Sequence, residues 1–335
     1  QHDARGPFVA AVAMPKSAVV TGAAGFIGSH LCEALVARDF DVIGIDAFTD
    51  YYDARIKRDN IAALLASPRF RLIEDSLAAL DLEKTLAGAS VVFHLAAQPG
   101  VRASWGKTFE PYLENNVRVT QRLCEAMRTL GGARLVYAGS SSVYGQTAQL
   151  PMREDHRTRP LSPYGVTKLA GEALCLLYAE NYGVPVVSLR YFTVYGPRQR
   201  PDMAFHRFIR AGLEGAPIEV YGSGTQTRDF TFVADAVAAN LAAMDYAGNQ
   251  TLFNIGGGSR VTLNSVLDML GTAMNRKLDV RYAEMQKGDV MHTFADVSLA
   301  ARELGFTPQT GLEEGLVREV EWLESLYRRI GKGVG

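Results

Sequence analysis

The fold is decided by residues 18–28, which read Ala-Val-Val-Thr-Gly-Ala-Ala-Gly-Phe-Ile-Gly. A short apolar run ends in a glycine-rich turn, and an amphipathic stretch follows over residues 26–38. The first glycine permits a tight turn, the second lets the backbone approach a pyrophosphate, and the third lets helix and strand pack closely. A helix that begins here offers free amides and a positive dipole end to phosphates. The stretch therefore predicts a dinucleotide site at Gly22, Gly25, Phe26, Ile27 and Gly28.

Short apolar runs alternate with amphipathic stretches along the rest of the first half. We expect strands at 42–45, 71–73, 91–94, 134–137 and 185–191, and helices at 116–130 and 164–182. The runs are apolar throughout rather than at every second residue, which is typical of a parallel sheet covered on both faces. The sequence therefore predicts an α/β fold built on a doubly wound parallel sheet, the Rossmann arrangement.

Glycine and proline divide the chain into shorter pieces after residue 196. Further helices are expected at 233–244, 263–274 and 311–328. We therefore expect a dinucleotide-binding Rossmann domain over 14–196 and a smaller C-terminal α/β lobe over 197–330, with some of the chain crossing back. Residues 1–13 are expected to be an added tail, because Met-Pro-Lys at 14–16 stands immediately before the first strand.

The composition excludes several classes of protein. Hydrophobic residues make up 47% and charged residues 21%, which is typical of a globular chain. Thirty-five Lys and Arg against 36 Asp and Glu leave a net charge of −1, which argues against a nucleic-acid or anionic-membrane surface. No apolar run approaches the roughly 20 residues that span a bilayer. We expect neither nucleic acid nor membrane as a partner.

The cysteines and histidines give little support for a disulfide framework or for a metal site. Cys32, Cys124 and Cys175 are odd in number and lie in stretches with helical spacing, which favours reduced thiols in a cytoplasmic protein. The six histidines are scattered without the spacing of metal ligands, so we expect no metal site.

Asp46 stands at the end of the second expected strand. A carboxylate there can accept hydrogen bonds from both ribose hydroxyls of an adenosine and repels a 2′-phosphate, so NAD is favoured over NADP. Small residues after the fourth strand, Leu95, Ala96 and Ala97, leave room for a flat cofactor. Asn115 is a candidate for a polar contact beneath it.

Tyr164 and Lys168 open the long helix and share one of its faces. An ammonium near a phenol stabilises the phenolate, so we expect the pKa of Tyr164 to fall from about 10 towards neutrality. Tyr164 could then act as a general base on a substrate hydroxyl during hydride transfer. Ser140, Ser141 and Ser142 follow the fifth strand at the same sheet edge, where a serine hydroxyl could relay the proton.

Four motifs together resemble the extended short-chain dehydrogenase/reductases that act on nucleotide sugars. They are the glycine turn, His94-Leu-Ala-Ala97, Ser140-Ser-Ser-Val-Tyr-Gly145 and Tyr164-x3-Lys168. Arg190-Tyr-Phe-Thr-Val-Tyr-Gly196, Thr227-Arg-Asp-Phe230 and Lys287-Gly-Asp-Val290 are also similar to that group, so the likeness covers nearly the whole chain. The resemblance implies NAD as cofactor, with Tyr191 beside it, catalysis by Ser140, Tyr164 and Lys168, and a C-terminal lobe that binds a nucleotide sugar.

Within this group, the residues at the positions of Ser141 and Ser142 distinguish enzymes that catalyse different reactions. The 4,6-dehydratases carry an Asp-Glu pair before Val-Tyr-Gly and the glucuronate decarboxylases carry a Glu, whereas this chain has Ser141-Ser142. Epimerisation at C4 needs no such acid. The runs 46–53, 98–102 and 197–203 resemble UDP-glucuronate 4-epimerases. This resemblance implies that Thr193 lies near the sugar and that Arg200 lies near its C6 carboxylate, with Arg102 as a second candidate for the carboxylate. The alternative is that Arg200 pairs with Asp202 or with a phosphate.

The resemblance also implies how the nucleotide is held. Arg228 would clamp the diphosphate, Asp289 would bind the ribose, and the segment with Val220 and Tyr221 would lie along the uracil. The chain departs from the family at Gln286, where an arginine is frequent. It departs again at Asp75 and Ser76, which replace the adenine-side Gly-Asp.

Several alternatives stay open from the sequence. They are a UDP-glucose or UDP-N-acetylglucosamine 4-epimerase, a UDP-glucuronate decarboxylase, a sugar 4,6-dehydratase and a non-catalytic dinucleotide sensor. Resembling proteins form dimers through two helices that correspond to 116–130 and 164–182, so a homodimer is expected.

Overall fold

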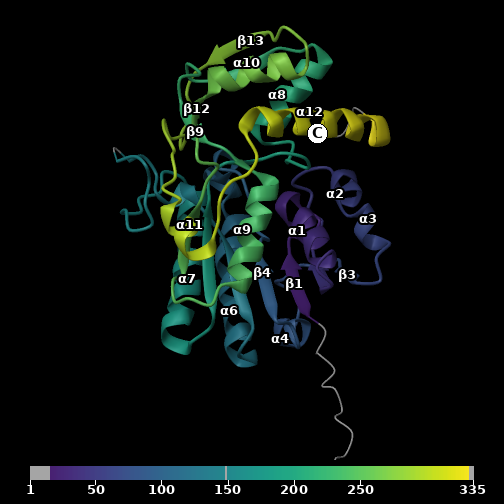
Figure 1. Ribbon diagram of the computed structural model, residues 1–335, viewed down its shortest axis with the longest axis vertical. Coiled ribbons are helices and arrows are strands. Elements are labelled where there is room, and N and C mark those ends of the chain that lie inside the picture. The colour runs from purple at the N-terminus through teal and green to yellow at the C-terminus, as the bar shows by residue number, and fades with distance from the viewer. Residues whose placement is uncertain (1–15, 148, 332–335) are drawn as a thin grey trace, which may run out of the picture.

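A seven-stranded parallel sheet forms the centre of the molecule, in the order β11-β6-β5-β4-β1-β2-β3 (Figure 1). The computed structural model describes residues 16–147 and 149–331, so the tail expected over 1–13 lies outside it. The sheet confirms the doubly wound α/β prediction. Its strands are β1 (Ser17–Thr21), β2 (Asp41–Ile45), β3 (Phe70–Ile73), β4 (Val91–His94), β5 (Arg134–Ser140), β6 (Val186–Tyr191) and β11 (Leu252–Ile255).

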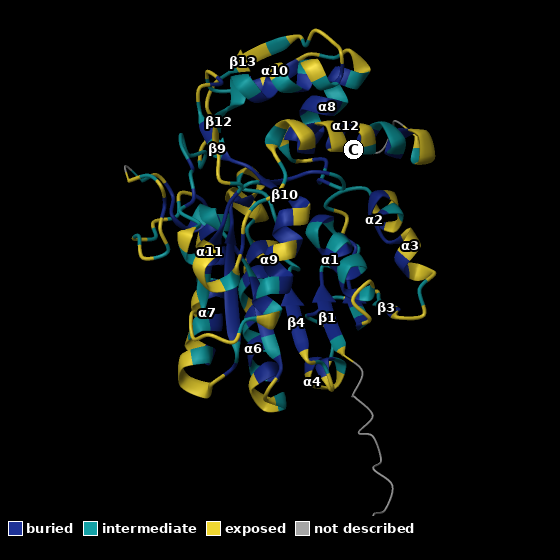
Figure 2. Ribbon diagram, viewed as in Figure 1, coloured by how far each residue is buried: buried dark blue, intermediate teal, exposed yellow. Residues whose placement is uncertain are grey.

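Helices cover both faces of the sheet because successive strand residues point to opposite sides. Val19 and Val92 pack with the helices of one face, whereas Ala18 and Val20 pack with those of the other. Figure 2 shows buried strands between helices whose outer surfaces are exposed. The first face carries α4 (Leu82–Leu86), α6 (Val119–Leu130) and α7 (Pro163–Tyr182); the second carries α1 (Phe26–Val36), α9 (Val233–Asp245) and α11 (Ser298–Leu304).

A smaller lobe lies above the carboxyl ends of the strands (Figure 1). It contains the helices α8 (Ala204–Glu214), α10 (Leu263–Ala273) and α12 (Leu312–Ile330). Its strands form three pairs: β8 (Ile218–Tyr221) with β13 (Val280–Ala283), β9 (Thr227–Asp229) with β12 (Arg260–Thr262), and β7 (Val194–Tyr195) with β10 (Thr231–Phe232). Because β11 and α9 follow residue 196 yet belong to the main sheet and its helical layer, the chain passes between the two parts more than once.

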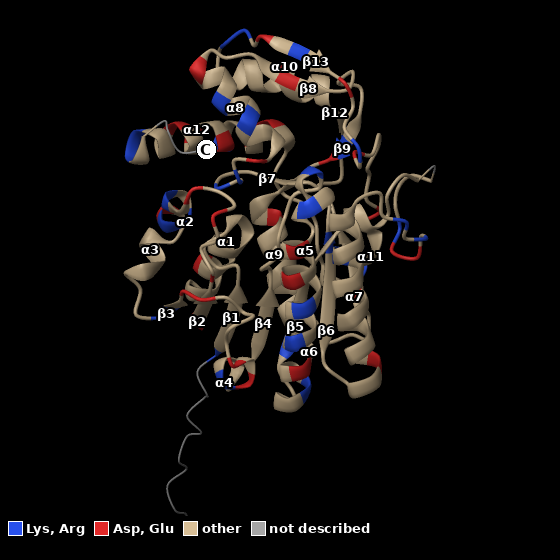
Figure 3. Cartoon of the chain, turned by 180° about the vertical axis from the view of Figure 1, so that it is seen from behind, with Lys and Arg blue, Asp and Glu red and all other residues tan. Residues whose placement is uncertain are grey.

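Shorter elements connect these layers. They are α2 (Ala54–Asn60), α3 (Ala62–Leu65), α5 (Glu110–Leu113) and the single helical turns η1 (Arg102–Ser104), η2 (Gly106–Thr108), η3 (Glu114–Arg118) and η4 (Ser141–Val143). Basic and acidic side chains are interspersed along α6 and over the upper lobe (Figure 3), in keeping with the balanced net charge.

The sheet register brings the carboxyl ends of the strands to one edge. Thr21 at the end of β1 is aligned with Ile45 of β2 and with His94 of β4. Ser140 at the end of β5 is aligned with Tyr191 of β6. Side chains that follow these strands therefore gather around the turn after β1, beneath the smaller lobe.

Candidate active site

One cavity at this edge is lined by every residue that the sequence assigns to the cofactor. The same cavity is lined by Arg200 and by tyrosines that the sequence analysis did not assign. Its predicted members are Gly22, Gly25, Phe26, Ile27, Gly28, Asp46, Asp75, Ser76, Leu95, Ala96, Ala97, Asn115, Tyr164, Lys168 and Tyr191. Residues at the ends of six strands and residues of several helices thus meet in a single space.

The turn after β1 has a geometry that requires glycine. Gly22 has a φ of +71°, which L side chains rarely adopt, and its N–H donates to the Ile45 carbonyl at 2.7 Å. A Cβ on Gly28 would lie 2.1 Å from the Gly22 carbonyl oxygen. Both glycines therefore hold the amino end of α1 close to the strand, as a phosphate-binding turn needs.

Asp46 is buried and already engaged by the protein. One oxygen accepts from the Phe48 N–H and from the Lys57 ammonium, each at 2.9 Å, and the other accepts from the Ala24 N–H at 3.1 Å. Asp46 thus also holds the glycine turn in place. Lys57, which the sequence analysis missed, lies in the cavity wall beside Asp46 and packs against the ring of Tyr52. Its neighbours at 54–60 look like a surface helix in sequence, so no local pattern marks it.

Tyr164 and Lys168 line the other end of the cavity, and Ser140 hydrogen-bonds to Tyr164 from outside the lining. Tyr164 lies in the first turn of α7, which begins where the Ser162 hydroxyl accepts from the Gly165 N–H. Ser140 ends β5, and its hydroxyl lies 2.6 Å from that of Ser142. The Lys168 ammonium is buried, 4.6 Å from the centre of the Tyr137 ring.

The expected effect of Lys168 on Tyr164 is wrong for the protein alone. Burial raises the pKa of Tyr164 above its ordinary value, and the nearby Arg200 charge and a hydrogen bond with Ser140 offset only part of this rise. Burial lowers the pKa of Lys168 to about 8. The charge that lowers this pKa is that of Arg200 rather than the expected Lys168, and it does not offset the cost of desolvating a phenolate.

Of the predicted contacts to the sugar, Arg200 lines the cavity, and it already has a partner. Its guanidinium makes a bidentate ion pair with Asp202, with distances of 2.9 and 3.0 Å. This is the pairing left open as the alternative to a substrate carboxylate. Thr193 follows β6 directly, and its carbonyl accepts from the Thr231 N–H. Ser141 and Ser142 form the turn η4 beside Ser140.

The predicted nucleotide contacts gather in the smaller lobe. Arg102 donates to Asp289 at 2.8 Å and lies over the Tyr221 ring, 4.1 Å from its centre. Arg228 donates to backbone carbonyls of Thr227 and Met291. Gln286 donates only weakly to a backbone carbonyl nearby, at 3.4 Å.

Val220 differs from the other predicted nucleotide contacts, because the whole residue is buried in the core, within β8 and beside β13. Arg102 and Asp289 lie 187 residues apart, so their pairing could not be read from local sequence.

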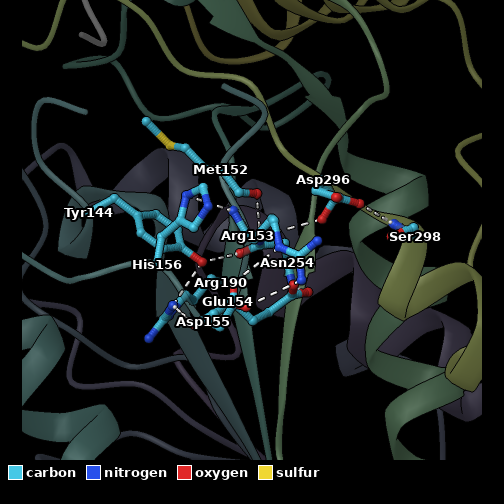
Figure 4. Close-up of polar contacts among 10 residues, drawn as sticks. All are labelled: Tyr144, Met152, Arg153, Glu154, Asp155, His156, Arg190, Asn254, Asp296 and Ser298. Carbon is cyan, nitrogen blue, oxygen red and sulfur yellow. Dashed lines mark hydrogen bonds and ion pairs between the residues drawn. The ribbon is translucent and has the colours of Figure 1, made fainter. Parts of the chain in front are cut away.

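Tyr144, Arg190 and Asn254 belong to a buried polar network (Figure 4). Arg190 on β6 donates to the Tyr144 hydroxyl at 2.7 Å, and that hydroxyl donates to Asn254 on β11 at 2.7 Å. Arg190 also pairs with Glu172 on α7 at 2.6 and 2.9 Å, both side chains being at most 5% exposed. Because Tyr144 directly follows η4 and Glu172 lies two turns after Tyr164, the network links the catalytic elements.

Glu172→Gln should lower the free energy of unfolding by about 3 kcal/mol, because it leaves the buried Arg190 charge without a counter-charge. Urea unfolding followed by circular dichroism measures this loss. Glu180→Gln, an exposed change on the same helix, is the control and should leave the midpoint within error. Equal midpoints for the two variants would contradict the role given to the pair.

In residues 16–147 and 149–331, no three His, Cys, Asp or Glu side chains gather as metal ligands would. Cys32, Cys124 and Cys175 are buried free thiols. No helix in the described part of the chain is long and apolar enough to cross a membrane.

A parallel sheet, a glycine turn that closes on α1 and a Ser-Tyr-Lys group define a dinucleotide-dependent enzyme of the short-chain dehydrogenase/reductase type. The chain belongs to the NAD dependent epimerase/dehydratase family, whose pattern matches residues 18–256. This confirms the expected family.

Individual relatives match almost the full chain. A UDP-glucuronate 4-epimerase of Thermodesulfobacterium geofontis is 38% identical, over 91% of this chain and 95% of its own. A protein of Bacillus subtilis described as an uncharacterized UDP-glucose epimerase is 45% identical, over 92% of this chain and 98% of its own. The UDP-glucuronic acid 4-epimerase of Bacillus cereus, solved with UDP-glucuronic acid and NAD, is 44% identical with a TM-score of 0.90, over 93% of this chain and all of the other.

Proposed function

We propose that this protein is an NAD-dependent UDP-glucuronate 4-epimerase, which interconverts UDP-glucuronate and UDP-galacturonate through a transient 4-keto sugar. The observation that carries the proposal is the single cavity that joins the glycine turn to Tyr164, Lys168 and Arg200. A cofactor-binding end, a proton-transfer group and a cation for a carboxylate are thereby placed in one space. The relatives with this activity support the choice of substrate.

The residues at the cofactor end fit NAD. The glycine turn leaves no room for a side chain at Gly28 and points the amino end of α1 into the cavity, as a pyrophosphate requires. Asp46 and Lys57 would hold the adenosine ribose, with Asp75 and Ser76 towards the adenine. Leu95, Ala96 and Ala97 would line the flat face, and Asn115 and Tyr191 would complete the wall.

Bound NAD supplies an acceptor that takes the C4 hydride and later returns it to the opposite face of the sugar. The chain supplies the proton chemistry: Tyr164 takes the C4 hydroxyl proton, Ser140 holds the reacting oxygen, and Lys168 favours the phenolate. The positive charge of an oxidised nicotinamide would further lower the pKa of Tyr164, which burial alone keeps high. Ser141 and Ser142 bring no acid to the sugar, so elimination of water has no proton donor on this turn.

The lobe that follows residue 196 would hold the UDP group, through Arg228 at the diphosphate and Asp289 at the ribose. Tyr221, with the buried Val220 supporting it in β8, would lie along the uracil, and Gln286 would stand at the edge of this segment. Many contacts to UDP and few to the sugar suit an enzyme that must rotate a bound keto sugar. Residues 14–196 would then serve mainly NAD and residues 197–330 mainly the nucleotide sugar.

The activity is tested by incubating the purified protein with UDP-glucuronate and separating the products by chromatography. UDP-galacturonate of unchanged mass is expected; loss of CO2 or water would instead indicate a decarboxylase or dehydratase. Parallel incubations with UDP-glucose and UDP-N-acetylglucosamine decide among the 4-epimerases. No product from any sugar, with NAD still bound, would favour a dinucleotide sensor.

Arg200→Ala should raise the KM for UDP-glucuronate at least about tenfold, because a carboxylate loses its guanidinium and meets an unpaired Asp202 instead. The KM for UDP-glucose, which has no carboxylate, should change less than about threefold. Steady-state kinetics with both sugars measure the difference. Arg281→Ala, which removes an exposed arginine from a surface pair, is the control. Equal losses for both sugars would remove Arg200 from the carboxylate site.

We further propose a cytoplasmic homodimer. Val166, Leu177 and Tyr182 on α7 are each more than half exposed, an apolar surface that a second copy would cover. Sedimentation of the wild-type protein against Leu177→Glu tests the dimer.

A further inference from the structure

Arg200 enters the cavity as one half of an ion pair. Its Nε and Nη2 atoms donate to the two carboxylate oxygens of Asp202, and the Tyr51 hydroxyl donates to Oδ2 of Asp202 at 3.2 Å. The side chains of Arg200 and Asp202 are 22% and 33% exposed. A bidentate pair fixes both groups in one geometry. Asp202 therefore occupies one of the two guanidinium edges that can hold a carboxylate through two parallel hydrogen bonds.

Tyr51 is itself held tightly. A Cβ on Gly100 would lie 2.4 Å from the Tyr51 hydroxyl oxygen, so this phenol fits against a glycine that has a φ of +101°. Tyr51 follows β2 in the same segment as Asp46 and lines the cavity. A residue from the cofactor side thus fixes the carboxylate that holds Arg200.

The pair acts directly on the catalytic centre. The Arg200 charge lowers the pKa of Tyr164, and the Asp202 charge raises it. Both charges therefore change the pKa of Tyr164, the residue proposed to take the C4 proton of the sugar. The cation that the cavity presents to a substrate is one that a neighbouring carboxylate partly neutralises.

We propose that Asp202, held by Tyr51, is a specificity-determining residue that limits how tightly Arg200 holds the sugar carboxylate. The inference rests on the proposed function, in which the keto sugar must release one orientation and adopt another. A bidentate grip on C6 would favour one orientation and slow the exchange. With Nε and one N–H of Nη2 engaged by Asp202, Arg200 offers the sugar the N–H groups of Nη1 and the second N–H of Nη2, from a cation whose charge Asp202 partly neutralises.

Asp202→Asn tests this inference because it keeps the shape of the side chain and removes its charge. The Kd for UDP-glucuronate should fall about fivefold to tenfold, since the Arg200 charge is no longer neutralised, and kcat should fall by a similar factor. The Kd for UDP-glucose should stay within about twofold. Tyr51→Phe should shift the same constants in the same direction by less. On an Arg200→Ala background, Asp202→Asn should have no such effect.

Calorimetry measures binding without turnover, and chromatography of UDP-galacturonate measures kcat. Asp53→Asn is the control, because Asp53 loses its charge in an exposed pair with Arg55 on the same segment. Weaker binding in Asp202→Asn would mean that Asp202 only positions Arg200, and unchanged constants would mean that the pair does not face the sugar; either result overturns the inference. If the wild type bound UDP-glucuronate but formed no UDP-galacturonate, the proposed epimerase activity would be rejected. The ratio of the Kd values of Asp202→Asn and the wild type for UDP-glucuronate would still decide the role of Asp202.

Discussion

Tyr164→Phe is expected to lower kcat for epimerisation at least about a thousandfold while NAD remains bound. The substitution removes one hydroxyl from the wall of the cavity and leaves the glycine turn, Asp46 and Lys57 unchanged. The lost group is the one that takes the C4 proton. Lys168 is not expected to replace it, because its ammonium lies over the Tyr137 ring, 4.6 Å from the ring centre.

The measurement is a turnover assay combined with the absorbance and mass of the cofactor released on denaturation. Tyr282→Phe removes a phenol from an exposed strand of the smaller lobe and should keep full activity. Turnover by Tyr164→Phe within about tenfold of the wild type would reject Tyr164 as the base. Released NADP in place of NAD would contradict the interpretation of Asp46.

The parts of the site that could be predicted share one property: they follow strands whose ends meet at one sheet edge. The glycine turn, Asp46, Leu95 and Ser140 all come directly after apolar runs, so the doubly wound order alone places them together. Tyr164 and Lys168 add a helix face at the same edge. These features are local in sequence and need no knowledge of distant contacts.

The residues that the sequence analysis missed depend on tertiary contacts. Lys57 lies on a short helix whose composition resembles a solvated surface, and only its contact with Asp46 brings it into the cavity. Tyr51 lies in a motif that was recognised, but its partner Asp202 is 151 residues away. Asp202 was considered only as an alternative partner of Arg200.

The pKa of Tyr164 could not be predicted from sequence for a related reason. Spacing shows which charges are near a phenol but not how completely the phenol is removed from water. Here burial is the largest influence on that pKa, and it acts against the neighbouring cation. The spacing of Tyr164 and Lys168 therefore predicted a fall in the pKa, whereas burial raises it and the cation that offsets part of the rise is Arg200.

Gly28→Ala is expected to weaken NAD binding at least about a hundredfold and to lower the free energy of unfolding by about 2 kcal/mol or more. The added Cβ would lie 2.1 Å from the Gly22 carbonyl oxygen and 2.9 Å from its carbonyl carbon, both backbone atoms of the turn. Either α1 or the turn must move, and both form the phosphate-binding geometry. The helix therefore cannot keep its amino end where a pyrophosphate would lie.

Titration of NAD into apoprotein and urea unfolding measure the two effects of Gly28→Ala. Gly311→Ala is the matched control, since a Cβ there meets nothing within 4 Å and its φ of −67° suits any residue. This control separates the clash from the general effect of replacing glycine, which by itself stabilises a chain slightly. If Gly28→Ala bound NAD as tightly as the wild type does, a shift of α1 would not affect NAD binding. The turn after β1 would then not be the phosphate-binding site.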